Sequence, residues 1–139
     1  MDFLIFLGCN YKQLPYLISI KKKYKIILID KNNNNPGKKY AYLNYNCSYN
    51  DISGLSKIYG KIKKLNIKKV FTASSHYAHQ GAAYFAKKFK LKYPLLKNID
   101  ICLDKSKFYP FFEKNKLLIP KTKYVKNYLQ LKKELSKYN

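Results

Sequence analysis

The sequence predicts an α/β fold, in which an open parallel sheet carries helices on both of its faces. The runs 3–7 and 25–29 are apolar without a break, which is typical of strands that are buried on both faces. Segments with apolar residues at helical spacing follow such runs, so strands and helices alternate along the chain. A length of 139 residues suits one compact domain with a short additional piece.

The first strand is expected over 3–7, and a loop follows it. Residues 13–23 are expected to form a helix, because their leucines and isoleucines recur on one side. Pro15 fits the first turn of this helix, where a missing N–H costs little. The second strand is expected over 25–29 and ends at Asp30.

The stretch 31–39 is polar and contains a Pro-Gly pair, so it is expected to be a loop. A short third strand is expected over 42–47. Apolar residues near helical spacing predict a helix over 51–65, which Asn50 or Asp51 could cap.

The fourth strand is expected over 69–72, followed by a loop and by a helix rich in small residues over 78–89. Right-handed crossovers make such strands parallel, and their ligands bind outside the carboxyl ends of the strands. Three loops occupy that edge, namely 8–13, 30–37 and 73–76. The sequence therefore predicts a ligand site there.

The tail differs in character from the first hundred residues. A helix is expected over 104–115 despite Pro110, then a connector over 117–120, a strand over 121–125 and a helix over 128–138. This last strand–helix pair has little to pack on. It is expected either to fold back on the first domain or to begin a second one that is cut off.

The net charge of +22 raises the question of nucleic-acid binding. All the basic residues are lysines, whereas readers of bases usually exploit the forked guanidinium of arginine. Lys, Asn, Ile and Tyr are over-used together and share A/T-rich codons, so nucleic acid is not expected as a partner. Evenly spread lysines would agree with that expectation, and clustered ones would argue against it. No apolar run approaches the ~20 residues that span a bilayer, so a cytoplasmic protein without a membrane span is expected.

The three cysteines, Cys9, Cys47 and Cys102, are far apart in the sequence and odd in number. No Cys-x-x-Cys pair exists, and His76 and His79 are the only histidines that could join a metal site. Free thiols are therefore expected, with neither a disulfide nor a metal site.

Several segments resemble a known family. The segments 6–15 (FLGCNYKQLP), 28–41 and 70–75 (VFTASS) are similar to the pre-ATP-grasp domain. That Rossmann-like domain opens biotin carboxylase, the large subunit of carbamoyl-phosphate synthase and many carboxylate–amine ligases. Residues 101–107 (ICLDKSK) and the segments 115–120 and 123–125 resemble the junction at which the ATP-grasp fold begins. The resemblance implies a pre-ATP-grasp domain over 1–100 and the incomplete start of an ATP-grasp domain over 101–139.

The resemblance also implies an activity, which is an ATP-dependent ligation. A carboxylate substrate becomes an acyl phosphate, and an amine displaces the phosphate. ATP and magnesium are the implied cofactors, and their main binding residues lie in the later part of the ATP-grasp domain. The chain alone is therefore expected to be inactive and to bind no cofactor tightly. Its implied partners are the remainder of that domain and a second copy in a homodimer. The alternative is a standalone Rossmann-like module that binds a nucleotide or another subunit, including the subunit of a split ligase.

The first loop contributes Gly8, Asn10 and Gln13 as candidate substrate-binding residues. A glycine after a buried strand lets the backbone approach a ligand, and the start of the following helix favours an anion. The resemblance implies that the position of Gln13 touches the carboxylate substrate. The alternative is that Gly8 only forms the turn and Gln13 only starts the helix. The dinucleotide fingerprint is missing because Asn10 and Gln13 stand in place of glycines, which disfavours NAD.

The other two loops contribute Asp30, Ser74, Ser75 and His76 as candidates near the substrate. Asp30 either contacts substrate or caps its loop. The hydroxyls of Ser74 and Ser75 could bind a substrate anion, or they only shape the loop. Many relatives carry an acid where His76 stands, so that acid's role does not transfer. A Ser–His hydrolase is disfavoured because no Gly-x-Ser-x-Gly elbow is present.

Lys105 is the candidate for binding the cofactor. It matches the lysine that opens the ATP-grasp region and contacts a nucleotide phosphate in relatives such as biotin carboxylase. A lysine near a helix start can act as a mobile point charge toward phosphate. The alternative is one more surface lysine among many.

Overall fold

The computed structural model describes residues 1–74, 76–118, 120 and 122–137, apart from the side chain of His76. The chain divides into two compact units, Met1–Asp100 and Ile101–Asn139.

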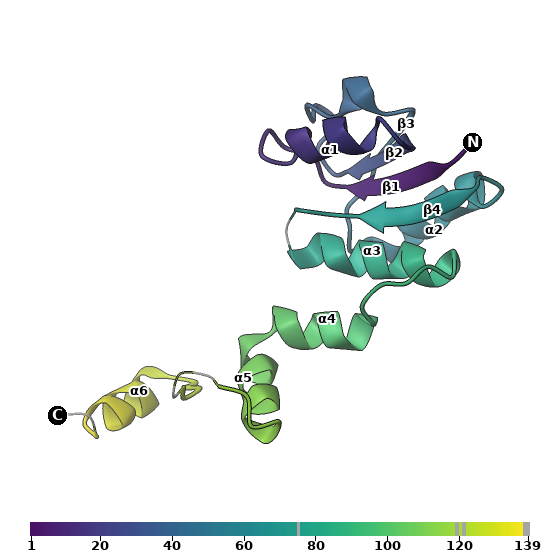
Figure 1. Ribbon diagram of the computed structural model, residues 1–139. Coiled ribbons are helices and arrows are strands. Elements are labelled where there is room, and N and C mark those ends of the chain that lie inside the picture. Colours follow the sequence, from purple (N-terminus) through teal and green to yellow (C-terminus); the bar gives the residue numbers. More distant parts are fainter. Residues whose placement is uncertain (75, 119, 121, 138–139) are drawn as a thin grey trace. The chain divides into compact units, whose positions relative to one another are not determined.

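The first unit is an α/β domain around a four-stranded parallel sheet, which confirms the predicted fold class (Figure 1). The strand order is β3-β2-β1-β4. The strands are β1 (Phe3–Leu7), β2 (Lys25–Asp30), β3 (Leu43–Asn46) and β4 (Ile67–Phe71). The helices are α1 (Leu14–Ile20), α2 (Ile52–Ile62) and α3 (His76–Lys88), with a short 3-10 turn η1 (Lys38–Tyr40). A further helix, α4 (Leu96–Leu103), runs across the boundary between the units.

The two faces of the sheet pack against different helices. Alternate side chains of a strand point to opposite faces, and in β1 Ile5 packs in one cluster while Phe6 packs in the other. The cluster around Ile5 includes Leu55 of α2 and Phe85 of α3, and the cluster around Phe6 includes Leu17 of α1. Burial of both faces explains why β1 and β2 are apolar without a break.

The start of α2 shows how the sequence sets a helix boundary. The carboxylate of Asp51 accepts a hydrogen bond from the N–H of Gly54 at 2.9 Å. Of the two caps considered, Asn50 and Asp51, it is therefore Asp51 that caps the helix. Such a cap stabilises a helix by about 1 kcal/mol.

Helix α3 begins at His76 rather than at 78, α1 and α2 are shorter than expected, and two further elements differ as well. Strand β4 begins at Ile67 rather than at 69, and the exposed Lys68 and Lys69 conceal its apolar pattern. Buried and exposed side chains do not alternate regularly in β4, because this strand lies at the edge of the sheet and its side chains are less buried than those of β1. Helix α4 had not been expected, and it buries only Ile99.

The second unit is helical. It contains α5 (Lys105–Lys114), which accommodates Pro110, and α6 (Tyr128–Leu135). The strand expected over 121–125 is wrong for 122–125, which have no regular structure, and Lys121 lies outside the described residues. A strand needs a partner for its backbone hydrogen bonds, and the described residues of this unit contain no other strand.

The second unit has little core of its own. Among its described residues, no hydrophobic side chain is fully buried. Several large apolar side chains are exposed instead: Leu117, Leu118, Tyr124, Tyr128, Leu129 and Leu135. Within the described part of the chain, no helix has both the length and the apolar character that crossing a membrane would require.

Candidate functional site

Gly8 forms the turn at the carboxyl end of β1. Its φ is +77°, in the left-handed region that favours glycine, and its N–H donates to the carbonyl oxygen of Ile29 at 2.9 Å. A Cβ at this position would lie 2.5 Å from Ser74 Oγ and 2.7 Å from the hydroxyl oxygen of Tyr49. The glycine therefore allows three loops to meet above β1.

Asp30 lies at the centre of these loops and is only 7% exposed. Its Oδ2 accepts from the N–H of Cys9 at 2.7 Å, and its Oδ1 accepts from the N–H of Asn32 at 2.8 Å. The charge of this carboxylate is also felt by the hydroxyl of the nearby Tyr49. The contacts of Asp30 are thus those of a residue that caps its own loop and fixes the loop after β1.

Tyr49 lies beside Asp30 and Ser74. Its hydroxyl is close to the Ser74 hydroxyl above Gly8, and both Ser74 and the Asp30 carboxylate influence its pKa. Burial, followed by the charge of Asp30, raises the pKa of Tyr49 well above its usual range. The phenol therefore stays protonated at neutral pH.

Gln13 connects the first loop with the loop after β4. The side chain is buried, its Oε1 accepts from the N–H of Asn10 at 2.9 Å, and its Nε2 donates to the carbonyl oxygen of Ala73 at 3.1 Å. Thr72 adds a second connection, because its hydroxyl donates to the Leu7 carbonyl at 2.9 Å and accepts from the Ser74 N–H at 3.1 Å. Both polar ends of Gln13 are used inside the fold.

The structure brings Gly8, Gln13, Asp30 and Ser74 together at the carboxyl edge of the sheet, as the topology had indicated. Asn10 is exposed beside them and accepts from the N–H of Lys12 at 2.8 Å.

Two candidate residues are described only in part or not at all. Ser75 lies outside the described residues, and His76 is described only as the first residue of α3. Their predicted contacts with substrate stay predictions.

Sequence reasoning missed Tyr49 and Thr72. Thr72 is predicted only as the end of a strand, although it directly precedes a candidate loop. Tyr49 follows β3, whose carboxyl end lies at the same edge as those of β1, β2 and β4. The loop after β3 therefore belongs with the other three loops of this edge, and its residues are candidates for the same reason.

The chemistry available at this edge is binding rather than nucleophilic attack. Burial and the nearby Asp30 raise the pKa of the Cys9 thiol to about 11, so the reactive thiolate is scarce at neutral pH. Burial and then Asp51 raise the pKa of Cys47 as well. Among the described residues, no group of three or more His, Cys, Asp or Glu side chains could hold a metal ion.

Lys105 belongs to the second unit. It is the first residue of α5, and the preceding Asp104 caps the helix by accepting from the N–H of Ser106 at 2.9 Å. The hydrogen bonds from Ser106 hold the pKa of Asp104 below its usual value. Lys105 lines a cavity of about 210 Å³ within this unit; the other lining residues are Ser106, Tyr109, Pro110, Glu113, Thr122, Lys123 and Tyr124.

Solved structures of ligases resemble the chain over almost its whole length. The phosphoribosylglycinamide synthetase from Anaerococcus prevotii matches with a TM-score of 0.68 at 22% identity, over 99% of this chain and 35% of that one. An N5-carboxyaminoimidazole ribonucleotide synthetase, solved as an ADP complex, matches with 0.68 at 18% identity, over 98% and 34%. The L-amino acid ligase from Bacillus licheniformis matches with 0.66 at 14% identity, over 99% and 42%.

These likenesses establish the fold. The chain thus shares its fold with the matched parts of these three proteins. The chain spans little more than a third of the length of the first two structures. No protein-family model matches the sequence, and no curated protein matches it.

Proposed function

We propose that this chain is the N-terminal, substrate-side part of an ATP-grasp ligase of the carboxylate–amine type. In such an enzyme ATP with magnesium activates a carboxylate as an acyl phosphate, which an amine then attacks. The observation that carries the proposal is the match of 98–99% of the chain to three ligases at TM-scores of 0.66–0.68.

The carboxylate substrate is assigned to the carboxyl edge of the sheet. Ligands of open parallel sheets bind outside the carboxyl ends of the strands, and Gly8, Asn10 and Ser74 surround that edge. Asn10 is exposed, and Ser74 is partly so, which supports a direct contact for each. Ser75 and His76 directly follow Ser74 in the sequence and are assigned to the same substrate-binding segment.

Gln13 and Asp30 have a positioning role in this proposal. Both are buried, and the hydrogen bonds of Gln13 to the Asn10 N–H and the Ala73 carbonyl fix two loops relative to each other. Asp30 fixes the backbone of Cys9. A contact between Gln13 and substrate would require its amide to leave one of these partners.

The ATP phosphates are assigned to the cavity that Lys105 lines. The lining donors suit phosphate oxygens, because Lys105 and Lys123 supply ammonium groups and Thr122 supplies a hydroxyl. Magnesium ligands are assigned to the rest of the ATP-grasp domain, since the described residues offer no metal cluster.

The rest of the domain is also proposed to cover the second unit. Leu118 is fully exposed and Leu129 is 76% exposed, and apolar surface of this kind marks an interaction site. On this proposal the 139-residue chain alone does not catalyse ligation.

A thermal-shift titration tests the proposal on the longer protein that it implies. ATP with magnesium is expected to raise Tm, and Lys105→Ala is expected to weaken the apparent affinity roughly tenfold, as the loss of one charged hydrogen bond does. Lys114→Ala, an exposed lysine of the same helix, is the control and should behave as the wild type.

Two results would count against the proposal. One is a longer protein whose Tm does not respond to ATP with magnesium. The other is a gene whose reading frame encodes no further ATP-grasp segment in the same chain. The second result would favour a standalone module or the subunit of a split ligase.

A further inference from the structure

The lysines of the first unit are unevenly placed. Most of them lie where the helices end and the strands begin, which is the amino edge of the sheet. We call these the amino-edge lysines: Lys21, Lys22, Lys23, Lys25, Lys61, Lys63, Lys64, Lys68, Lys69, Lys87, Lys88, Lys90 and Lys92.

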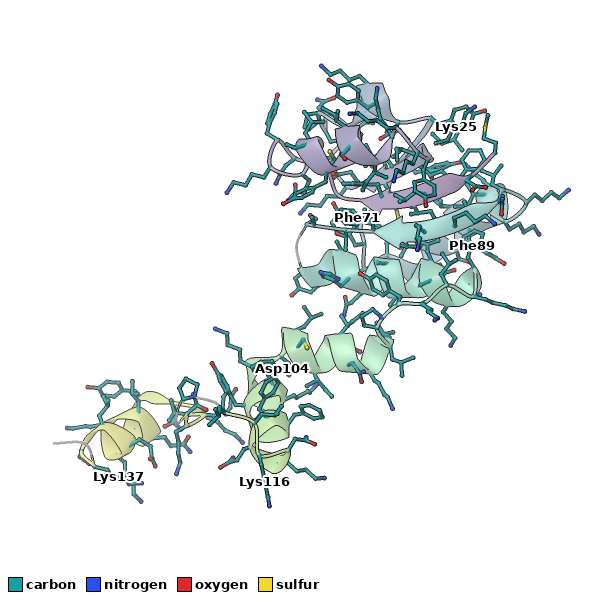
Figure 2. All side chains as sticks on the ribbon, viewed as in Figure 1. Lys25, Phe71, Phe89, Asp104, Lys116 and Lys137 are labelled. Carbon is teal, nitrogen blue, oxygen red and sulfur yellow. The ribbon has the colours of Figure 1, made fainter. Side chains whose placement is uncertain are left out.

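The topology gathers them from distant parts of the sequence. Phe3 pairs with Lys25 on one side and with Ile67 on the other, so the three strands begin together. The strands are parallel, so each connecting helix runs back to the edge at which the strands begin. Helices α1, α2 and α3 all end in lysines or just before them. Figure 2 shows Lys25 and Phe89 at this edge and Phe71 at the opposite one.

Almost no negative charge balances the amino-edge lysines. The one carboxylate among the strand starts is that of Asp2, which accepts from Nδ2 of Asn66 at 2.8 Å. Over the part of the chain that the structure describes, every salt bridge lies in the second unit. Instead, aromatic rings support some of these ammonium groups: Lys25 Nζ lies 4.2 Å from the ring centroid of Tyr42, and Lys88 Nζ lies 5.4 Å from that of Tyr59.

Helix ends explain part of this placement. Lysines near a helix C-terminus are each stabilised by roughly 0.3–1 kcal/mol through the helix dipole. The dipole does not explain Lys25, Lys68 and Lys69, which lie in strands. Whatever the origin of each lysine, a surface with one sign of charge attracts polyanions and accelerates their association.

We propose that the amino edge binds the phosphate backbone of nucleic acid without reading its sequence. The proposal reverses the expectation drawn from composition, because the lysines are clustered. The absence of arginine from the sequence disfavours bidentate base contacts but not phosphate contacts, for which a lysine point charge suffices.

A nucleic-acid backbone fits this edge better than a lipid bilayer does. Peripheral membrane segments bury leucine, phenylalanine or tryptophan beneath their lysines. Beside the strand starts at this edge, the exposed large hydrophobic side chains are Met1 and Tyr42. The exposed Leu95 and Leu96 follow Lys92 by three and four residues, at the start of α4. The described strand starts are thus charged and carry no exposed leucine, phenylalanine or tryptophan. This charged surface also lies at the opposite edge of the sheet from the proposed substrate site. The proposals of nucleic-acid binding and of substrate binding can therefore be tested independently of each other.

The test measures the fluorescence anisotropy of a labelled 20-nucleotide oligo(dT) with the 139-residue chain. We expect binding at 50 mM KCl that weakens steeply with salt; four phosphate contacts to a single strand would reduce the affinity roughly 50-fold between 50 and 200 mM. The variant Lys22→Gln/Lys63→Gln/Lys64→Gln/Lys87→Gln should lose most of this affinity and most of its salt dependence. All four side chains are exposed.

The matched control removes the same charge from lysines away from the amino edge, as Lys12→Gln/Lys31→Gln/Lys38→Gln/Lys57→Gln, all of them exposed. It should retain affinity within about threefold, as expected when no phosphate contact is lost. Circular dichroism checks that both variants are folded. The proposal is overturned if the two variants lose affinity equally, since net charge alone would then explain binding. It is also overturned if wild type does not bind at 50 mM KCl, or if polyglutamate at equal charge concentration competes as well as unlabelled oligo(dT).

Discussion

The side-chain amide of Gln13 donates to the carbonyl oxygen of Ala73 at 3.1 Å, across 60 positions of sequence. This hydrogen bond connects the loop that leaves β1 with the loop that leaves β4 (Figure 1). A helix-starting residue therefore also sets the distance between the two loops to which we assign the substrate.

Replacing Gln13 by Glu should separate the two hydrogen bonds of this side chain. Glutamate can still accept from the Asn10 N–H, but it has no donor for the Ala73 carbonyl. We expect a loss of about 1–3 kcal/mol in the free energy of unfolding, because the buried side chain at position 13 loses its hydrogen bond to the Ala73 carbonyl. Urea unfolding measures the loss. Gln130→Glu, at an exposed site in the second unit, is the control; an equal effect there would argue against the connection.

Gly8→Ala should be strongly destabilising. The new Cβ would meet Ser74 Oγ at 2.5 Å and would also hold a φ of +77° that alanine disfavours. A cost of about 2 kcal/mol or more is expected from the backbone strain and the contact together. Gly60→Ala is the matched control in α2, where no atom lies within 4 Å of the new Cβ. It should stabilise the helix by roughly 0.5–1 kcal/mol. Thermal unfolding of both variants checks the opposite signs.

Tyr49→Phe should remove a polar neighbour of Asp30 and Ser74 without changing the packing of the ring. Because the Asp30 carboxylate is buried, losing a nearby hydroxyl is expected to cost about 1–3 kcal/mol. Tyr59→Phe, a half-buried tyrosine of α2, is the control and should cost much less. If Tyr49→Phe is as stable as the wild type in urea, the hydroxyl does not stabilise the buried Asp30 carboxylate.

The high pKa of Tyr49 predicts a loss of stability at alkaline pH. A pKa raised in the folded state means that the unfolded chain releases its proton first, so stability falls as pH rises above about 10, the pKa of an unfolded tyrosine. Cys9 adds a similar decline from about pH 9 toward its folded pKa of about 11. Urea midpoints at pH 8 and 10.5 measure the decline. The double variant Tyr49→Phe/Cys9→Ala should lower its slope, and an unchanged slope would contradict the assignment.

The cysteines should react with a thiol reagent in a fixed order. Cys102 is exposed, whereas Cys9 and Cys47 are buried with raised pKa values. At pH 8 about one Cys9 thiol in a thousand is ionised if its pKa is near 11. One thiol per native chain should therefore react quickly with Ellman's reagent, and Cys102→Ser should remove that phase. Persistence of the fast phase in Cys102→Ser would contradict the burial of the other two.

The sheet could be predicted because burial of a strand on both faces leaves a continuous apolar run in the sequence. Strands β1 and β2 are buried on both faces and read as unbroken apolar runs. The end of the chain could not be predicted in the same way, because a strand over 121–125 depends on a partner that sequence spacing does not reveal. Strand β4 began earlier than expected because an exposed edge position accepts Lys68 as readily as an apolar residue.

At the site, topology predicted the meeting of Gly8, Gln13 and Ser74, because parallel strands end at one edge. The partners of each side chain were not predictable. Asp30 could cap a loop or face a ligand, and only the paths of the loops bring Cys9 and Tyr49 to its carboxylate. The clustering of the lysines has the same origin, since residues such as Lys22 and Lys87 meet at one edge only after folding.

Strand β4 also affects whether copies of this chain can associate through the edges of their sheets at high concentration. It lies at one side of the described sheet, so its outer backbone groups are open to pairing with a foreign strand. A strand that docked there would have to approach the side chains of Lys68 and Lys69, both exposed. Two copies meeting edge to edge would bring these ammonium groups together and repel each other. The lysines that interrupt the apolar pattern of β4 thus disfavour aggregation through this edge of the sheet.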